Sequence, residues 1–209
     1  MTRWIYAALL SWMLVPLASA EGNADAGKSL FPVCTACHGP QGQGNQAMNA
    51  PKLAGQESWY LIKQMQLFQQ GARGTAPGDM TGMQMAAMSK GPQLASPEAL
   101  ANLAAYIQTF PDTPPATTVT GDVERGASLY PVCAACHGQK GEGNEAMAGP
   151  RLTGQNDWYL VSQIKKFKQG QRGYHNADHG GRQMRPMVNM LTNDEAINDV
   201  VAYINSLNK

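Results

Sequence analysis

The sequence has no excess of charge of either sign. Charged residues make up only 15% of the 209 residues, and 16 Lys and Arg residues nearly balance 15 Asp and Glu residues, which gives a net charge of +1. A protein that binds nucleic acid through its phosphates needs a basic surface. The composition therefore gives no reason to expect nucleic acid as a partner.

Aromatic residues are scarce, at 7% of the chain, whereas glycine and proline are frequent, with 22 and 13 residues. The length allows one large domain or two small ones. Two side-chain cores of about ninety residues each would be thin on this composition. Something other than side chains is therefore expected to fill them.

No apolar run that could cross a membrane follows residue 20. The first twenty residues combine the basic Arg3, an apolar run from Trp4 to Pro16 and the small-residue site Ala18-Ser19-Ala20, which is the pattern of a cleaved export signal. A retained anchor helix is the alternative, but the run is shorter than the span of about 20 residues that a bilayer needs. We predict a signal peptide at residues 1–20 and a mature protein in the periplasm, with peripheral membrane association left open.

The chain contains one unit written twice, at an offset of 99 residues. The segment 30–34 returns at 129–133, and the segment 59–61 returns at 158–160. Near the end the offset drops to 97, so the first copy has two extra residues between Met88 and Leu94. We predict two tandem domains, at residues 21–110 and 121–209, joined by a proline-rich linker at residues 111–120.

Each copy is expected to be all-α, with helices joined by long loops. Short first helices are predicted at 24–31 and 123–130. Middle helices are predicted to begin at Ser58 and at Asn156 or Asp157, each acting as the cap. The final helices are predicted to begin at Ser96-Pro97 and at Thr192, where Thr192 and Glu195 have capping-box spacing. No segment alternates like a strand.

Cysteine is limited to four residues, and all four lie in C-x-x-C-H motifs. This motif attaches c-type haem: two thiols on one turn each form a thioether, and the adjacent His binds the iron. A zinc site would need a second cysteine pair nearby, a redox dithiol a strand-helix setting, and structural disulfides would not need the matching histidines. We predict two covalent haem c groups, held by Cys34, Cys37 and His38 and by Cys133, Cys136 and His137.

A second axial ligand would distinguish an electron carrier from a haem with an open site, and Met is the usual partner of His in cytochromes c. The candidates are Met80, Met83, Met85 and Met88 in the first copy and Met184, Met187 and Met190 in the second. The 99-residue register retains two pairs, Met85 with Met184 and Met88 with Met187. Both pairs are predicted to lie on a loop before the final helix.

The two C-x-x-C-H units, the segment Pro51 to Gln56 with its repeat, and the M-x-x-M segments resemble the cytochrome c4 family over residues 22–207. The resemblance implies tandem cytochrome c domains, each wrapped around a haem, with Met85 and Met184 as axial ligands. Met184 precedes Leu191 by seven residues, as in that family. Met85 precedes Leu94 by nine, so the neighbouring Met80, Met83 and Met88 stay open as first-haem ligands.

The same resemblance assigns further roles. The carbonyls of Pro51 and Pro150 are expected to accept a hydrogen bond from the haem-binding histidines, which would fix the imidazoles. Lys52 and Arg151 are expected either to pair with haem propionates or to be solvated. Trp59, Tyr60, Trp158 and Tyr159 are expected to bond propionates or to pack.

The predicted function is electron transfer between respiratory partners, such as an electron donor and a terminal oxidase, and not catalysis. A dihaem enzyme such as a peroxidase is the alternative, but it would need two unlike haems, and a fixed subunit of a respiratory complex is another. A basic patch of Lys165, Lys166 and Lys168 is predicted to steer an acidic partner, with an ordinary solvated helix face as the alternative. His175 and His179 are expected to be solvated in a loop.

Overall fold

The computed structural model describes residues 22–208, so the predicted signal peptide at residues 1–20 lies outside the described residues. Within that range the chain has ten α-helices, two short 3-10 helices and no strand. The all-α prediction is confirmed. The helices are α1 Ala24–Lys28, α2 Pro32–His38, α3 Ser58–Gln69, α4 Met80–Ser89, η1 Pro92–Leu94, α5 Pro97–Ile107, α6 Val123–Leu129, α7 Pro131–His137, η2 Glu145–Met147, α8 Asp157–Lys168, α9 His179–Val188 and α10 Asp194–Ser206.

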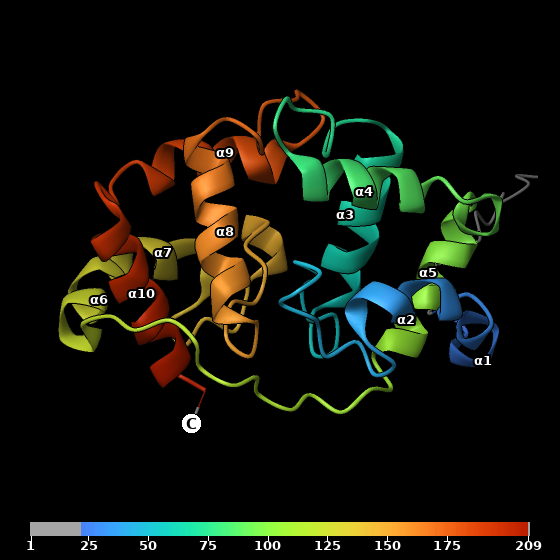
Figure 1. Cartoon of the computed structure of the whole chain (residues 1–209), viewed down its shortest axis with the longest axis horizontal. Helices are drawn as coiled ribbons and strands as arrows, with labels where there is room; N and C mark the ends of the chain where they lie inside the picture. Colours follow the sequence, from blue (N-terminus) through green and yellow to red (C-terminus); the bar gives the residue numbers. More distant parts are fainter. Residues whose placement is uncertain (1–21, 209) are drawn as a thin grey trace, which may run out of the picture.

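The helices form two lobes with the same order of elements, α1 to α5 in one and α6 to α10 in the other (Figure 1). The helices α3 and α8 stand on the inner sides of the lobes, and α4 and α9 lie along one edge of the molecule. Residues 111–120, the predicted linker, contain no helix and run along the opposite edge. Within residues 22–208, no helix is both long and apolar enough to span a bilayer.

The first and last helices of each lobe cross very closely. A Cβ atom at Gly27 of α1 would lie 1.9 Å from the carbonyl oxygen of Asn102 in α5, and one at Gly126 of α6 would lie 2.1 Å from that of Asp199 in α10. Only glycine allows a backbone approach of this kind. The two repeated glycines therefore allow the first and last helices of each lobe to pack in direct backbone contact.

Some predicted helix starts are confirmed and others are wrong. Ser96 caps α5 by accepting a hydrogen bond from the Ala99 N–H, with Pro97 in the first helical position. The predicted capping box at Thr192 is wrong, because Asn193 caps α10. Ser58 is the first residue of α3, and the cap position belongs to Glu57.

The methionine segments are helical, so the predicted loops before the final helices are wrong. Asp79 and Asp178 cap α4 and α9, and their side chains accept hydrogen bonds from the N–H groups of Gly82 and Gly181. Glycines in the first turn and Pro186 inside α9 lower the intrinsic helix propensity of these segments. The aspartate caps and packing against α3 and α8 offset that low propensity.

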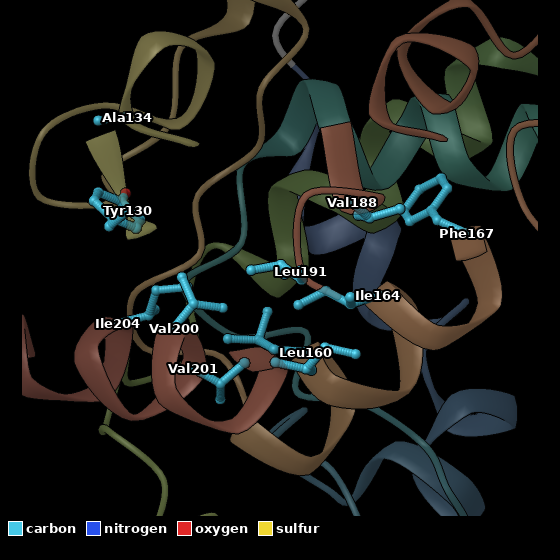
Figure 2. Close-up of a cluster of buried hydrophobic side chains, with 11 residues drawn as sticks. Tyr130, Ala134, Leu160, Ile164, Phe167, Val188, Leu191, Val200, Val201 and Ile204 are labelled. Atoms are coloured by element: carbon cyan, nitrogen blue, oxygen red, sulfur yellow. The ribbon is translucent and has the colours of Figure 1, made fainter. Parts of the chain in front are cut away.

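The apolar faces predicted for the final helices are buried, at Leu100, Leu103, Ala104 and Ile107 in α5 and at Ile197, Val200, Val201 and Ile204 in α10. In the second lobe, the face of α10 meets buried side chains of α8, including Leu160 and Ile164, while Tyr130 and Ala134 lie apart from them (Figure 2). Each lobe has its own apolar cluster of this kind. One cysteine of each C-x-x-C-H helix, Cys34 or Cys133, packs against the apolar cluster of its lobe.

Candidate haem sites

Each C-x-x-C-H segment forms a short helix that begins at a proline. Pro32 and Pro131 occupy the first helical position, where the missing N–H would have had no partner. Gly39 and Gly138, with φ of 82° and 84°, end the helices directly after the histidines. The two cysteines of each motif lie three residues apart, on one helix face, and all four thiols are free.

The thiols are not arranged as a reactive dithiol. Burial raises the pKa of Cys34 to about 11, and burial also raises the pKa of Cys133. Reactive cysteines need a lowered pKa that gives a thiolate at neutral pH. A zinc site would need further ligands, and residues 22–208 contain no cluster of three His, Cys, Asp or Glu side chains that could hold a metal ion.

The two histidines are buried and held in the same way. The Nδ1–H of His38 donates to the carbonyl oxygen of Pro51 at 2.8 Å, and that of His137 donates to Pro150 at 2.7 Å. A carbonyl only accepts, so the proton sits on Nδ1 and leaves Nε2 free to bind a metal. Burial lowers the pKa of both histidines, which favours the neutral, ligating form. The hydrogen bonds that the resemblance implied for Pro51 and Pro150 are present.

A large apolar cavity opens beside the first motif. Its wall contains Cys34, Cys37 and His38, together with Met85 and Met88 from α4. Apolar side chains of α3 and α5 complete it, including Leu61, Ile62, Met65, Phe68, Leu100, Leu103 and Ile107. Two thiols, a free imidazole nitrogen and a thioether around one apolar space fit a covalently attached haem. In the second lobe, Cys133 and Met184 pack against the equivalent cluster.

The methionine candidates differ in exposure. Met80, Met83 and Met88 of α4 are 65%, 47% and 47% exposed, and Met187 and Met190 are 42% and 37% exposed. Met85 and Met184, which the 99-residue register pairs, are both only partly exposed. Of the two pairs that the register retains, burial therefore favours Met85 with Met184 over the exposed Met88 with Met187.

The sequence did not indicate a pair of buried arginines between the lobes. Arg73 donates to Gln64 at 2.6 Å and, across the junction, to Tyr159 and Gln163 at 3.1 Å each. Arg172 donates to Gln163 at 2.9 Å and to Tyr60 across the junction. The only sequence signal was that both arginines recur in register between glycines.

Neither arginine has a carboxylate among its hydrogen-bond partners within residues 22–208, and the Nε atom of each is buried without a partner. Arg73 also lines the cavity beside His38. Buried cations are normally paired with an anion. The haem carboxylates would supply one, so this part of the wall also fits the cofactor.

The structure counts against the predicted basic patch on the middle helix of the second lobe, because all three lysines are bonded to other groups of the protein, Lys165 at the surface and the other two in partly buried contacts. Lys166 reaches Asp79 in the first lobe at 2.5 Å, and Lys165 pairs with Asp194 at 2.6 Å. Lys168 donates to the carbonyl oxygen of Leu191. The predicted exposure of His175 and His179 is confirmed, although His179 begins α9 instead of lying in a loop.

Lys52 and Arg151 share one carboxylate of the linker segment. Lys52 Nζ lies 2.6 Å from Asp112 Oδ1, and Arg151 Nη1 lies 2.7 Å from Asp112 Oδ2. Lys52 is only 3% exposed, so the solvated alternative is wrong for it. Because each basic residue directly follows the proline that binds a histidine, Asp112 ties the two His-binding segments together.

Three comparisons place these features among known proteins. The family model described as Cytochrome c matches residues 24–111 and 123–208. Cytochrome c4 of Azotobacter vinelandii is 37% identical over 99% of this chain and 100% of its own length, and that of Stutzerimonas stutzeri is 33% identical over the same shares. The crystal structure of reduced recombinant cytochrome c4 from Pseudomonas stutzeri matches with a TM-score of 0.67 and 29% identity, over 88% of this chain and 97% of that one.

Proposed function

The chain belongs to the cytochrome c family and, within it, to the cytochrome c4 proteins, and from this premise we propose that it passes single electrons between respiratory partners in the periplasm. It is a c-type cytochrome with two covalently bound haem c groups, one for each cysteine pair. We propose an electron donor on one side and a terminal oxidase or similar acceptor on the other. The haem iron supplies reversible one-electron oxidation and reduction.

The matching settings of His38 and His137 support this function most strongly. Both imidazoles are buried, both donate Nδ1–H to a proline carbonyl, and both leave Nε2 free. A dihaem enzyme needs one iron that differs from the other. Two sites built alike support two electron-carrying haems instead.

We assign the remaining roles to named side chains. Cys34, Cys37, Cys133 and Cys136 would hold the haem groups by thioether bonds, and Nε2 of His38 and of His137 would bind the iron. Met85 and Met184 would each supply the second protein ligand of an iron, because they are the paired methionines that are only partly exposed. Filling both axial positions keeps small molecules away from the iron.

Arg73 and Arg172 are proposed to face the haem carboxylates at the junction of the lobes. Their unpartnered Nε atoms and the adjoining phenol groups of Tyr60 and Tyr159 supply donors for an anion. The rings of Phe68 and Phe167 support the guanidinium groups from below, at 4.5 Å and 4.3 Å from the ring centroids. The arginines would then orient both haem groups toward the same junction.

Haem stoichiometry and carbon monoxide binding test the function together. We expect two covalent haems per chain, low-spin spectra in both oxidation states, and little binding of carbon monoxide to the reduced protein near neutral pH. Rapid binding of one equivalent would show an open iron and would support the enzyme alternative. A protein with one haem would contradict the assignment of one motif, and a protein with none would contradict both.

A further inference from the structure

The peptide group that follows each His-binding proline is hydrogen-bonded at both of its ends. The carbonyl of Pro51 accepts from His38, and the N–H of the same peptide, which belongs to Lys52, donates to Asn156 Oδ1 at 2.8 Å. Gln155 Oε1 lies at 3.2 Å from the same nitrogen. Asn156 and Gln155 belong to the second lobe, so the first histidine is linked across the junction through one peptide.

The second lobe repeats this arrangement with a different acceptor and without a counterpart of the Gln155 Oε1 contact. The carbonyl of Pro150 accepts from His137, and the N–H of Arg151 donates to Glu57 Oε2 of the first lobe at 2.9 Å. Glu57 and Asn156 occupy equivalent places, 99 residues apart, at the cap positions of α3 and α8. The N–H of Arg151 therefore donates to a carboxylate, whereas the N–H of Lys52 donates to a neutral amide.

Both side chains point to the opposite lobe and not to their own helix. Although Glu57 and Asn156 occupy the cap positions, neither side chain accepts a capping hydrogen bond from its own helix. Glycines of the opposite lobe make room for them: a Cβ atom at Gly143 would lie 2.1 Å from Glu57 Oε1, and one at Gly44 would lie 2.4 Å from Asn156 Oδ1. Each lobe thus has a glycine that leaves space for the side chain from the other lobe.

A carboxylate and an amide polarise a peptide to different degrees. Hydrogen bonds to a charged acceptor are stronger than neutral ones, and successive hydrogen bonds in a chain strengthen each other. A more polarised peptide puts more negative charge on the Pro150 oxygen, which pulls harder on the Nδ1 proton of His137. A ligating His whose other N–H is strongly bound is a more basic ligand, and a more basic ligand favours the oxidised iron.

We propose that Glu57, a residue of the first lobe, is a positioning residue for the second haem and lowers its reduction potential through the Arg151–Pro150 peptide. Asn156 serves the first haem in the equivalent place without a charge. The two haems thus have the same kinds of ligands and different potentials. The proposal rests on the proposed function, in which His137 is an axial ligand.

The surroundings of Glu57 act on its charge in opposite directions. Burial, with a smaller contribution from the negative charge of Glu145, raises the pKa of Glu57. The N–H and the guanidinium of Arg151 favour the carboxylate and oppose that change. A half-buried carboxylate is less screened by solvent than an exposed one.

The test replaces Glu57 by its uncharged isostere in the complete dihaem protein. For Glu57→Gln, we expect the potential of the second haem to rise while that of the first is unchanged. We also expect the Nδ1 proton of His137, observed by NMR in the reduced protein, to move upfield, while that of His38 stays in place. Loss of charge acting only through space would move the potential without moving that proton.

Asn156→Asp is the reciprocal variant and acts on the other haem. It should lower the potential of the first haem and move the His38 Nδ1 proton downfield. Equal shifts of both haems, no shift, or a potential shift without the proton shift in either variant would overturn the proposal. Haem content and low-spin spectra of the parent protein are measured first, because failure there would contradict the proposed function and not the role of Glu57.

Discussion

At the scale of single residues, the proposed function depends on two histidines and two methionines. His38 and His137 are fixed by the prolines thirteen residues further along. Among the methionines that the repeat pairs, Met85 and Met184 are distinguished by lower exposure. The ligand assignment can be tested one residue at a time.

Replacing Met184 by alanine should remove the second haem's sulfur-to-iron absorbance at the red end of the visible spectrum, because the iron loses its thioether ligand. Carbon monoxide should then bind one equivalent of the reduced protein. Met187→Ala is the matched control, since Met187 is 42% exposed on the same helix and should leave the spectrum unchanged. The reverse pattern would show that Met187 is the ligand.

At the scale of helices, α4 and α9 carry these methionines and are anchored differently. Asp79 caps α4 and also pairs with Lys166 of the other lobe, whereas Oδ2 of Asp178 at the start of α9 is buried with no partner. The repeat explains the difference, because the residue equivalent to Lys166 is Leu67. The Met85 helix is therefore tied to the second lobe.

Asp79→Asn should destabilise the protein more than Asp178→Asn does. Losing the charge at Asp79 leaves the ammonium of Lys166 largely buried and unpaired, and breaking a buried pair in this way costs about 3 kcal/mol or more. Midpoints of guanidinium unfolding of the two holo variants provide the comparison. Equal midpoints would show that the Lys166 pair adds nothing to the anchoring of α4.

Sequence patterns identified the elements whose chemistry is local. The C-x-x-C-H helices, the glycine-ended middle helices and the apolar faces around Leu103 and Val200 follow from spacing alone. The helices α4 and α9 were missed because Gly82, Gly181 and Pro186 have low helix propensity, and the offsetting contacts are tertiary. Lys166, Arg73 and Glu57 have partners in the other lobe. Such contacts join residues far apart in the sequence, so no sequence pattern predicts them.

At the scale of the whole molecule, the lobes are joined by polar contacts, and Asp112 is central to them. Burial disfavours the charge on Asp112, but hydrogen bonds and charges from Lys52 and Arg151 outweigh it and hold its pKa below the usual value. A carboxylate with a lowered folded-state pKa stabilises the fold above the unfolded-state pKa of about 3.9. That stabilisation is lost as the pH falls through the folded-state value.

Asp112→Asn should therefore lower the unfolding midpoint at neutral pH, and the difference from the parent protein should shrink as the pH falls below about 4. Denaturant midpoints measured across this range give the result. Glu98, in the first turn of α5, is a suitable control site for a charge-removing change, because it is exposed. A difference between parent and Asp112→Asn that is independent of pH would contradict a role for the charge.

The central claim is that the two lobes hold two haems of the same kind, each with His and Met bound. A coordinated methionine methyl group lies against the haem, whose ring current shifts its NMR signal far upfield in the reduced, diamagnetic protein. We predict two such three-proton signals, one lost in a Met85→Ala variant and the other in Met184→Ala. A single upfield methyl signal, or none, in the fully reduced dihaem protein would contradict the account.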